Sequence, residues 1–525
     1  MFAKIYSAGL FGIHGYIVEV EVNISNGIPQ LNMTGALSNE TREGQFRIWN
    51  AIKNIDIGFR PQKITVNLSP AFIRKSGTAY DISIAVGILA AAGLIPDLKL
   101  ESFAFLGELG LDGSIKPVNG VLSLSMALRD AGIKYLILAN ENVAEARLVD
   151  GIRAVGVKSL KDIAESFRYG RTAEGCMNML EKNKKEVPKD SLHIDNMENE
   201  PDFMDVHGQE YLRRAAEIAV SGRHNILFSG PAGTGKTMIA KRMPGIMPSL
   251  TREEDIEISK VYSVRGLLPK DRPLFSRRPF RSPHHGITMA SFLGGGANVL
   301  PGEISLASGG ILFLDELPLF NRSVVEALRQ PMEDKKITIN RLRGSYVYPA
   351  DFQLVAACNN CACGYFPDRT KCHCTESQIK AYMGHLSKPL LERIDICAEA
   401  SPVSYEELTV SNEACIKGRY ESSADIRKRV ETVHKIQEKR FKNEPEIKFN
   451  SGMGIHEIEK YCVLRKNEAL LMKEMFIAKN LSARTYHKVL KVARTIADMD
   501  GDEYISEKAL IEAVSLRSLE DRLFK

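Results

Sequence analysis

The first 170 residues alternate between strand-like and helix-like patterns. Apolar side chains occupy every second position in residues 17–24 and 63–68, as expected of strands that bury one face. Residues 46–55 carry apolar side chains at helical spacing, and residues 134–140 return to a strand pattern. This alternation predicts a layered α/β or α+β domain over residues 1–170.

The pattern changes three more times along the chain. Residues 171–203 are charged, with few large apolar side chains after Leu180, and predict a linker. A second α/β pattern covers residues 204–402 and ends where strand patterns stop. Residues 403–525 predict a helical domain. Its helices are expected at residues 424–441, 466–480, 482–499 and 505–517.

The composition is that of an ordinary globular protein, with 44% hydrophobic and 26% charged residues. The net charge of +5 permits a nucleic-acid partner without requiring one. The N-terminal segment has neither the unbroken apolar run nor the cleavage site of a signal peptide. The longest apolar run, residues 84–95, is shorter than the roughly 20 residues that cross a bilayer. We therefore expect a cytoplasmic protein with no membrane partner.

A glycine-rich segment carries the strongest chemical signal in the chain. It follows an apolar strand at residues 226–228 and matches the phosphate-binding loop pattern. The segment consists of Gly230, Pro231, Ala232, Gly233, Thr234, Gly235, Lys236 and Thr237. Glycines allow backbone N–H groups to face phosphate oxygens, and the following helix directs its positive dipole end toward them. We expect Lys236 to bind the β- and γ-phosphates and Thr237 to bind Mg²⁺.

A second apolar strand, at residues 311–314, ends in two carboxylates. Asp315 is expected to hold Mg²⁺ through water, and Glu316 to act as the general base that polarises the attacking water. The alternative for this pair is an exposed turn with no catalytic function. Together with the glycine-rich segment, the pair predicts hydrolysis of ATP.

Two further polar residues are candidates for the same reaction. Asn359 ends a third apolar strand, where its amide could orient the lytic water. Arg393 follows an apolar helical stretch and could stabilise charge on the γ-phosphate of an adjacent subunit. The alternative for Arg393 is a surface ion pair with Asp395 or Glu392.

Together these residues resemble the motifs of AAA+ ATPases and, more specifically, of the magnesium-chelatase-like branch known as the YifB/ComM family. Supporting stretches lie at residues 205–210, 278–288, 301–320, 361–366 and 482–498, and the resemblance extends over nearly the whole chain. It implies that Asn359 is sensor 1, that Arg393 is an arginine finger and that Arg484 is sensor 2. It further implies an AAA+ P-loop core with a helical lid, homo-hexameric rings and an ATP-driven motor that extends branched DNA during recombination.

The N-terminal region resembles the proteolytic domain of Lon, an α+β fold of the ribosomal S5 domain 2-like type, in residues 75–81 and 107–121. That fold uses a serine nucleophile with a lysine base. Here Ala79 stands at the serine position, and Leu122 and Leu124 stand where Lon carries lysines. The resemblance therefore implies a non-catalytic domain that docks a substrate or a partner.

A cysteine-rich insert at residues 358–374 contains two Cys-x-Cys pairs separated by eight residues. The pairs are Cys361 with Cys363 and Cys372 with Cys374. Four thiolates can close a tetrahedral Zn²⁺ site. Such a site would stiffen a loop at a subunit interface or at the pore. The alternative is a set of reduced thiols without metal.

Residues 335–349 predict a β-hairpin, and in related ring motors the hairpin at this position projects into the central pore. Its basic residues would then touch DNA phosphates without sequence preference. They are Lys335, Lys336, Arg341 and Arg343. A second insert, at residues 282–300, carries a glycine tip at 294–296. The alternative for both inserts is a solvated surface loop.

The leading hypothesis is an ATP-hydrolysing hexameric ring motor that remodels DNA by branch migration. A metal-chelatase motor subunit that acts on a protein partner is the second hypothesis, and the N-terminal domain counts against it. An ATP-dependent protease is the third, and Ala79, Leu122 and Leu124 count against it.

Overall fold

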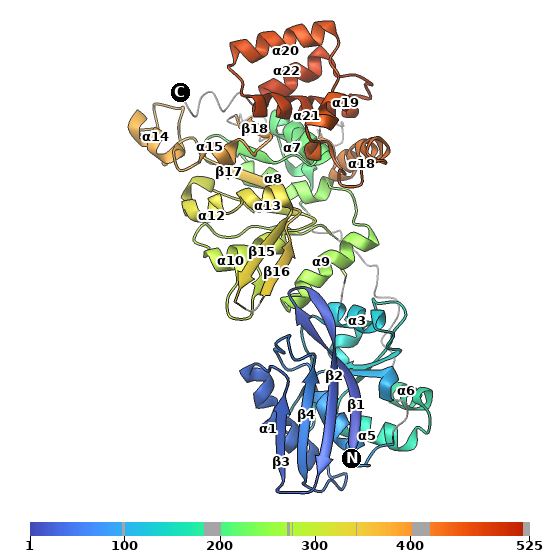
Figure 1. Ribbon diagram of the computed structural model, residues 1–525. Coiled ribbons are helices and arrows are strands. Elements are labelled where there is room, and N and C mark those ends of the chain that lie inside the picture. Colours follow the sequence, from blue (N-terminus) through green and yellow to red (C-terminus); the bar gives the residue numbers. More distant parts are fainter. Residues whose placement is uncertain are drawn as a thin grey trace.

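The computed structural model describes residues 1–96, 100–182, 201–269, 274–275, 277–342, 344–401 and 420–517. An N-terminal sheet, a central sheet and a bundle of C-terminal helices follow one another from the bottom to the top of Figure 1. The mixed α/β fold class expected from the sequence is confirmed, including a parallel sheet beneath the glycine-rich segment. Within the described ranges, no helix combines the length and apolar character needed to cross a bilayer.

The N-terminal sheet has seven strands in the order β3-β4-β2-β1-β5-β8-β9. The strands are β1 (Phe2–Phe11), β2 (His14–Ser25), β3 (Gln30–Thr34), β4 (Lys63–Ser69), β5 (Phe103–Leu106), β8 (Tyr135–Ala139) and β9 (Arg153–Val157). Its two faces pack into separate apolar cores, because alternate residues of a strand point to opposite faces. In β5, for example, Phe103 and Phe105 enter one core whereas Ala104 and Leu106 enter the other.

Helices cover both faces of this sheet. They are α1 (Asn39–Asn54), α2 (Asp81–Ala91), α3 (Val121–Asp130), α5 (Leu160–Tyr169) and α6 (Ala173–Lys182). The apolar run of residues 84–95 falls largely within α2, which is buried along nearly its whole length. Helix α6 lies in the segment predicted to be linker. It packs Cys176, Met177 and Leu180 into the N-terminal core, so the prediction that the ordered pattern stops at residue 171 is wrong for these residues.

The central sheet has five parallel strands in the order β11-β14-β17-β10-β18. The strands are β10 (Ile226–Ser229), β11 (Phe280–Arg281), β14 (Ile311–Leu314), β17 (Gln353–Cys358) and β18 (Ile396–Glu399). Strands β10, β14 and β17 are buried throughout. Burial on both faces explains why they read as continuous apolar runs rather than alternating ones.

The C-terminal helices share an apolar core with one face of the central sheet. They are α18 (Ser423–Arg440), α19 (Ile455–Tyr461), α20 (Lys466–Ala478), α21 (Ala483–Asp500) and α22 (Glu507–Ser515). The helices expected from the sequence are confirmed, and α19 is an additional short one. Ser482 caps α21 by accepting a hydrogen bond from the amide of Thr485.

The N-terminal and central parts meet at two places. Helix α3 packs beside α9 (Arg252–Val264), and there the amide of Gly120 donates to the carbonyl of Ser263 at 3.1 Å. The hydroxyl of Ser263 also donates to the buried carboxylate of Glu145. At the turn between β1 and β2, Phe11 stacks on Tyr346 with ring centroids 4.6 Å apart. The neighbouring Ile13 is buried in the core of the central part.

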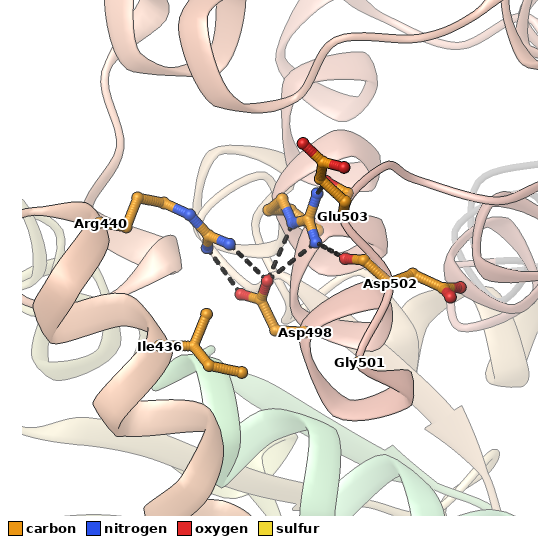
Figure 2. A pocket seen from close by; sticks show the side chains of 7 residues that line it. Ile436, Arg440, Asp498, Gly501, Asp502 and Glu503 are labelled. Atoms are coloured by element: carbon orange, nitrogen blue, oxygen red, sulfur yellow. Dashed lines mark hydrogen bonds and ion pairs between the residues drawn. The ribbon is translucent and has the colours of Figure 1, made fainter.

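A buried ion network ties the C-terminal helices together. Asp498 accepts hydrogen bonds from Arg440 of α18 at 2.6 Å and from Arg494 of α21 at 3.0 Å. Figure 2 shows the Arg440 guanidinium directed at the Asp498 carboxylate, beside a surface pocket. Arg494 also donates to the backbone carbonyls of Asp502 and Glu503. Asp498 is only 3% exposed, so its charge depends on these partners.

Replacing Asp498 with alanine is expected to lower the free energy of unfolding by about 3–5 kcal/mol, because the buried guanidinium of Arg494 loses its carboxylate partner. The matched control is Asp502→Ala, which keeps the backbone carbonyl that Arg494 uses. The control should stay within about 0.5 kcal/mol of wild type in urea unfolding. Equal stability of the two variants would contradict the assignment.

Candidate functional site

The glycine-rich segment lies at the carboxyl end of β10, next to the same ends of β14 and β17. It forms the turn that enters α8 (Lys236–Ile246), whose N-cap is Gly235. Gly233 and Gly235 have φ angles of +78° and +84°, which a residue with a side chain rarely adopts. The amino end of α8 therefore lies at this edge of the sheet, where a phosphate site requires it.

Lys236 joins the glycine-rich segment to the neighbouring strand. Its ammonium donates to the carbonyls of Gly230 at 2.8 Å and Pro231 at 2.7 Å. It also donates to the side-chain oxygen of Asn359, which follows β17, at 3.2 Å. The side chain is largely buried, and burial lowers the pKa of Lys236. An anion placed between the loop and α8 would offset this cost by pairing with the ammonium group.

Thr237 and Asp315 form the second cross-link of the site. The Thr237 hydroxyl donates to the Asp315 carboxylate at 2.9 Å, which joins α8 to the end of β14. The other carboxylate oxygen accepts from the amide of Glu316 at 3.0 Å. A hydroxyl beside a carboxylate is the kind of oxygen donor pair that Mg²⁺ prefers. These residues therefore fit the divalent cation that the sequence predicts.

Glu316 is held in an unusual backbone conformation. Its φ angle is +52°, and its side chain is exposed at the end of β14. A non-glycine residue in this region costs of order 1–3 kcal/mol and is found preferentially at functional sites. The side chain of Glu316 is thus exposed at the position where the chain turns away from the buried strand.

Arg393 and Arg484 lie outside the cluster around Lys236. Arg393 pairs with Glu333 at 2.7 Å and donates to the carbonyl of Pro389 at 2.8 Å. The alternative partners suggested by the sequence are engaged elsewhere, since Glu392 pairs with Arg484 at 3.2 Å. Asp395 pairs with Lys488. The ion-pair partner of Arg393 is thus Glu333, rather than Glu392 or Asp395.

Asp395 anchors the segment that carries Arg393, and sequence reasoning missed this role. Its carboxylate pairs with Lys488 of α21 at 2.7 Å and with His224 at 3.4 Å, and it accepts from the amide of Asn225. Burial would raise the pKa of Asp395, but Lys488 and His224 together hold it far below its usual value. The sequence around Asp395 gives little sign of this role, because its partners come from segments more than 90 residues away.

The four cysteines of the insert come together in one cluster. Their sulfur atoms all lie within 4.8 Å of one another, and the four could hold a metal ion. Sulfur–sulfur distances are 3.2 Å for Cys361–Cys363, 3.7 Å for Cys361–Cys372 and 3.5 Å for Cys363–Cys372. Gly364, which follows Cys363, accepts a hydrogen bond through its carbonyl from the amide of Ala232 at 2.8 Å. The cluster is therefore adjacent to the glycine-rich segment.

The basic hairpin consists of β15 (Lys336–Arg341) and β16 (Gly344–Pro349). Lys335, Lys336 and Arg341 are exposed, and Lys335 lies 3.6 Å from Asp351. Arg343 lies outside the described residues. The second insert contains α10 (Met289–Leu293), β12 (Gly294–Gly295) and β13 (Leu300–Pro301). The two inserts touch, because the Tyr348 hydroxyl donates to the carbonyl of Val299.

The N-terminal positions that correspond to a protease dyad form an apolar environment. Leu122 and Leu124 are buried, and Ala79 packs against their cluster. Lys75 is fully buried and donates to the carbonyls of Pro70 and Ile73, whereas Ser76 is exposed. A serine and a lysine oriented in this way do not form a nucleophile and base pair.

Comparison with known proteins covers nearly the whole chain. Three family models match the chain. The model described as subunit ChlI of Mg-chelatase matches residues 20–142. The model described as magnesium chelatase, subunit ChlI, matches residues 202–408, and the one for the ChlI C-terminal region matches residues 420–517. Competence protein ComM of Haemophilus influenzae is 36% identical over 519 residues, which is 98% of this chain and 97% of that protein. The uncharacterized protein YifB of Salmonella typhimurium is 38% identical over 523 residues, 99% of this chain and 98% of that protein.

A more distant similarity involves a protease. Lon protease 2 of Bacillus subtilis is 25% identical over 189 residues, which is 33% of this chain and 34% of that protein. This partial similarity lies in the N-terminal region. Both resemblances proposed from the sequence, to the YifB/ComM family and in part to Lon, are therefore confirmed.

Replacing Asp395 with alanine is expected to lower the free energy of unfolding by about 3–5 kcal/mol, because Lys488 loses its carboxylate partner in a buried position. The matched control is Glu392→Ala, which breaks an ion pair with a largely exposed arginine and should cost no more than about 1 kcal/mol. Urea unfolding of both variants measures the difference. Similar losses for both would show that Asp395 is not the anchor.

Proposed function

Because this chain belongs to the magnesium chelatase subunit ChlI family, together with ComM and YifB, we propose that it is an ATP-hydrolysing ring motor that remodels DNA. The observation that carries the proposal is the pair of cross-links at the edge of the central sheet. Lys236 reaches Asn359, and Thr237 reaches Asp315. They bring a phosphate-binding cation, a Mg²⁺ donor set and a water-orienting amide to one place.

In this proposal the residues of the site divide the work of hydrolysis. Lys236 and the amides of the glycine-rich segment bind the phosphates of ATP. Thr237 and Asp315 hold Mg²⁺, which neutralises charge on the β- and γ-phosphates when bound. Glu316 accepts a proton from the attacking water, and Asn359 orients that water.

The two outlying arginines fit roles that depend on neighbouring segments or subunits. Arg393 pairs with Glu333, and in this proposal it acts on the nucleotide of an adjacent protomer. Arg484, at the start of α21, couples the nucleotide to the C-terminal helices, which serve as a lid. Both roles require a ring, and we propose a homo-hexamer.

Three exposed cations support DNA as the partner. Lys335, Lys336 and Arg341 lie on or beside the β15–β16 hairpin, and six copies around a ring multiply weak phosphate contacts. The similarity to a protein named for competence favours a role in recombination during DNA uptake. In the same proposal the N-terminal region has a Lon-like fold without protease activity, and the four thiolates bind Zn²⁺ as a structural ion.

A metal-chelatase motor subunit is the second candidate, and one observation favours it. The matching family models are named for the ChlI subunit, and one of them covers residues 20–142. The N-terminal region therefore does not count against this candidate as expected from the sequence. Both candidates share the ATPase site, so they differ in the partner that stimulates hydrolysis.

Replacing Glu316 with glutamine is expected to leave ATP binding unchanged and to lower the hydrolysis rate at least about 100-fold, since the amide cannot accept the proton of the attacking water. The rate is measured by phosphate release, with and without forked DNA. Glu326→Gln, on a different segment of the same part, is the control. Stimulation of the wild-type protein by DNA supports the motor, and indifference to DNA together with stimulation by a protein partner supports the chelatase subunit. If Glu316→Gln hydrolyses ATP as fast as the wild-type protein, Glu316 is not the general base.

The double variant Lys336→Ala/Arg341→Ala is expected to bind DNA more weakly and with a flatter salt dependence. Each lost phosphate contact removes about 0.7–0.9 from the slope of log K against log salt concentration. The matched control is Lys435→Ala/Lys439→Ala, which removes two exposed charges from α18. Fluorescence anisotropy over a salt series measures both quantities. Equal slopes for the two double variants would exclude the hairpin as a DNA contact.

A further inference from the structure

The backbone of the cysteine cluster lies directly against the glycine-rich segment. The amide of Ala232 donates to the carbonyl of Gly364 at 2.8 Å. A side chain added at Gly364 would place its Cβ 2.9 Å from the Cβ of Ala232, and the residue has a φ angle of +81°. Two constraints therefore require glycine at this position: the conformation of the turn and the close approach of the two loops.

The contact reaches the groups that bind phosphate. Ala232 follows Pro231, whose carbonyl accepts from the ammonium of Lys236 at 2.7 Å. On the other side of the cluster, Asn359 precedes the cysteines by two residues and accepts from the same ammonium at 3.2 Å. The cysteine-rich insert thus contacts the glycine-rich segment through Gly364 and the Lys236 ammonium through Asn359.

The sulfur atoms are close enough together to bind one zinc ion. Zinc–sulfur bonds of ~2.3 Å place two thiolates of a tetrahedron roughly 3.8 Å apart. The distances of 3.2, 3.5 and 3.7 Å between three of the sulfurs come close to this value, and all four sulfurs lie within 4.8 Å. Four thiolates leave no open position, so the site is structural rather than catalytic.

The loop between the two cysteine pairs has little regular structure to hold it. Residues 361–374 contain neither a helix nor a strand in the described chain, and Phe366 donates its amide to the sulfur of Cys361 at 3.4 Å. A metal that joins both ends of this loop would fix Gly364 in place. Without the metal, the acceptor for the Ala232 amide is no longer held at the glycine-rich segment.

We propose that Zn²⁺ bound by Cys361, Cys363, Cys372 and Cys374 acts as a clamp that holds the glycine-rich segment in its phosphate-binding shape through Gly364. Zinc occupancy thereby sets the affinity for ATP. The inference rests on the proposed nucleotide function and adds a metal-dependent control of the same site.

The test uses the full-length protein and two direct readouts. Zinc content is measured by mass spectrometry, together with zinc release when the thiols are titrated with an organomercurial. The dissociation constant of a fluorescent ATP analogue is measured for the loaded protein, for protein stripped with a chelator, and after zinc is added back. One zinc ion per chain is expected, with about tenfold weaker nucleotide binding after stripping and full recovery on addition of zinc.

Two variants separate metal binding from its effect on the nucleotide. Cys372→Ser should lose zinc and bind the analogue as weakly as stripped protein, whereas Cys462→Ser, a buried cysteine of the C-terminal helices, should match wild type. Gly364→Ala keeps all four thiols but pushes the loop away from Ala232, so it should retain zinc and still lose affinity about tenfold. Ala362→Ser, an exposed change in the same loop, is its control.

The outcomes distinguish failure of the inference from failure of the proposed function. The clamp alone is overturned if the purified protein contains no zinc and still binds the ATP analogue with full affinity. It is also overturned if zinc-loaded and stripped protein bind the analogue equally well. Wild-type protein that carries zinc but binds no ATP analogue overturns the nucleotide function and the clamp with it. Circular dichroism shows whether stripped protein and Cys372→Ser remain folded. If either one is unfolded, the test rests on Gly364→Ala, and an unchanged affinity of that variant for the ATP analogue overturns the clamp.

Discussion

The ammonium group of Lys236 is the contact on which the arrangement of the site depends. Parallel strands carry their carboxyl ends to one edge of a sheet, but they do not fix the loops that leave that edge. Lys236 does so, because its three donors bind two carbonyls of its own loop and the amide oxygen of Asn359 on the adjacent segment. The low pKa that burial imposes on this lysine indicates that the cation is placed there at a cost, which an anionic ligand would offset.

Charged residues around this centre are held by two different means. Arg393 pairs with Glu333, and its segment is anchored two residues further on, where the Asp395 carboxylate pairs with Lys488 and accepts from the amide of Asn225. Among the described residues, the ion-pair partner of Arg484 is Glu392, and the Arg484 side chain is largely exposed. A buried anchor fixes a geometry, whereas an exposed pair exchanges readily with water. The segment of Arg393 is therefore anchored at a buried site, whereas the side chain of Arg484 lies largely in solvent.

The elements that sequence patterns predicted well are those whose signal is local. Strand β14 reads as a continuous apolar run, and Asp315 and Glu316 follow it directly. Helix α6 was missed because it leads directly into a highly charged stretch that begins at Glu181, and the whole segment was taken as linker. The anchor at Asp395 could not be predicted, because His224 and Lys488 reach it from distant segments through tertiary packing alone.

Pattern reasoning also had no access to contacts between the parts. The β15–β16 hairpin was expected to project into a central pore, and in the structure its Tyr346 stacks on Phe11 of the N-terminal sheet. Ile13, two residues further on, is buried in the core of the central part. A hairpin that tilts must therefore carry the β1–β2 turn with it or separate two stacked rings. The hairpin is thus coupled to the N-terminal sheet, and the stiffness of that sheet limits how far the hairpin can tilt.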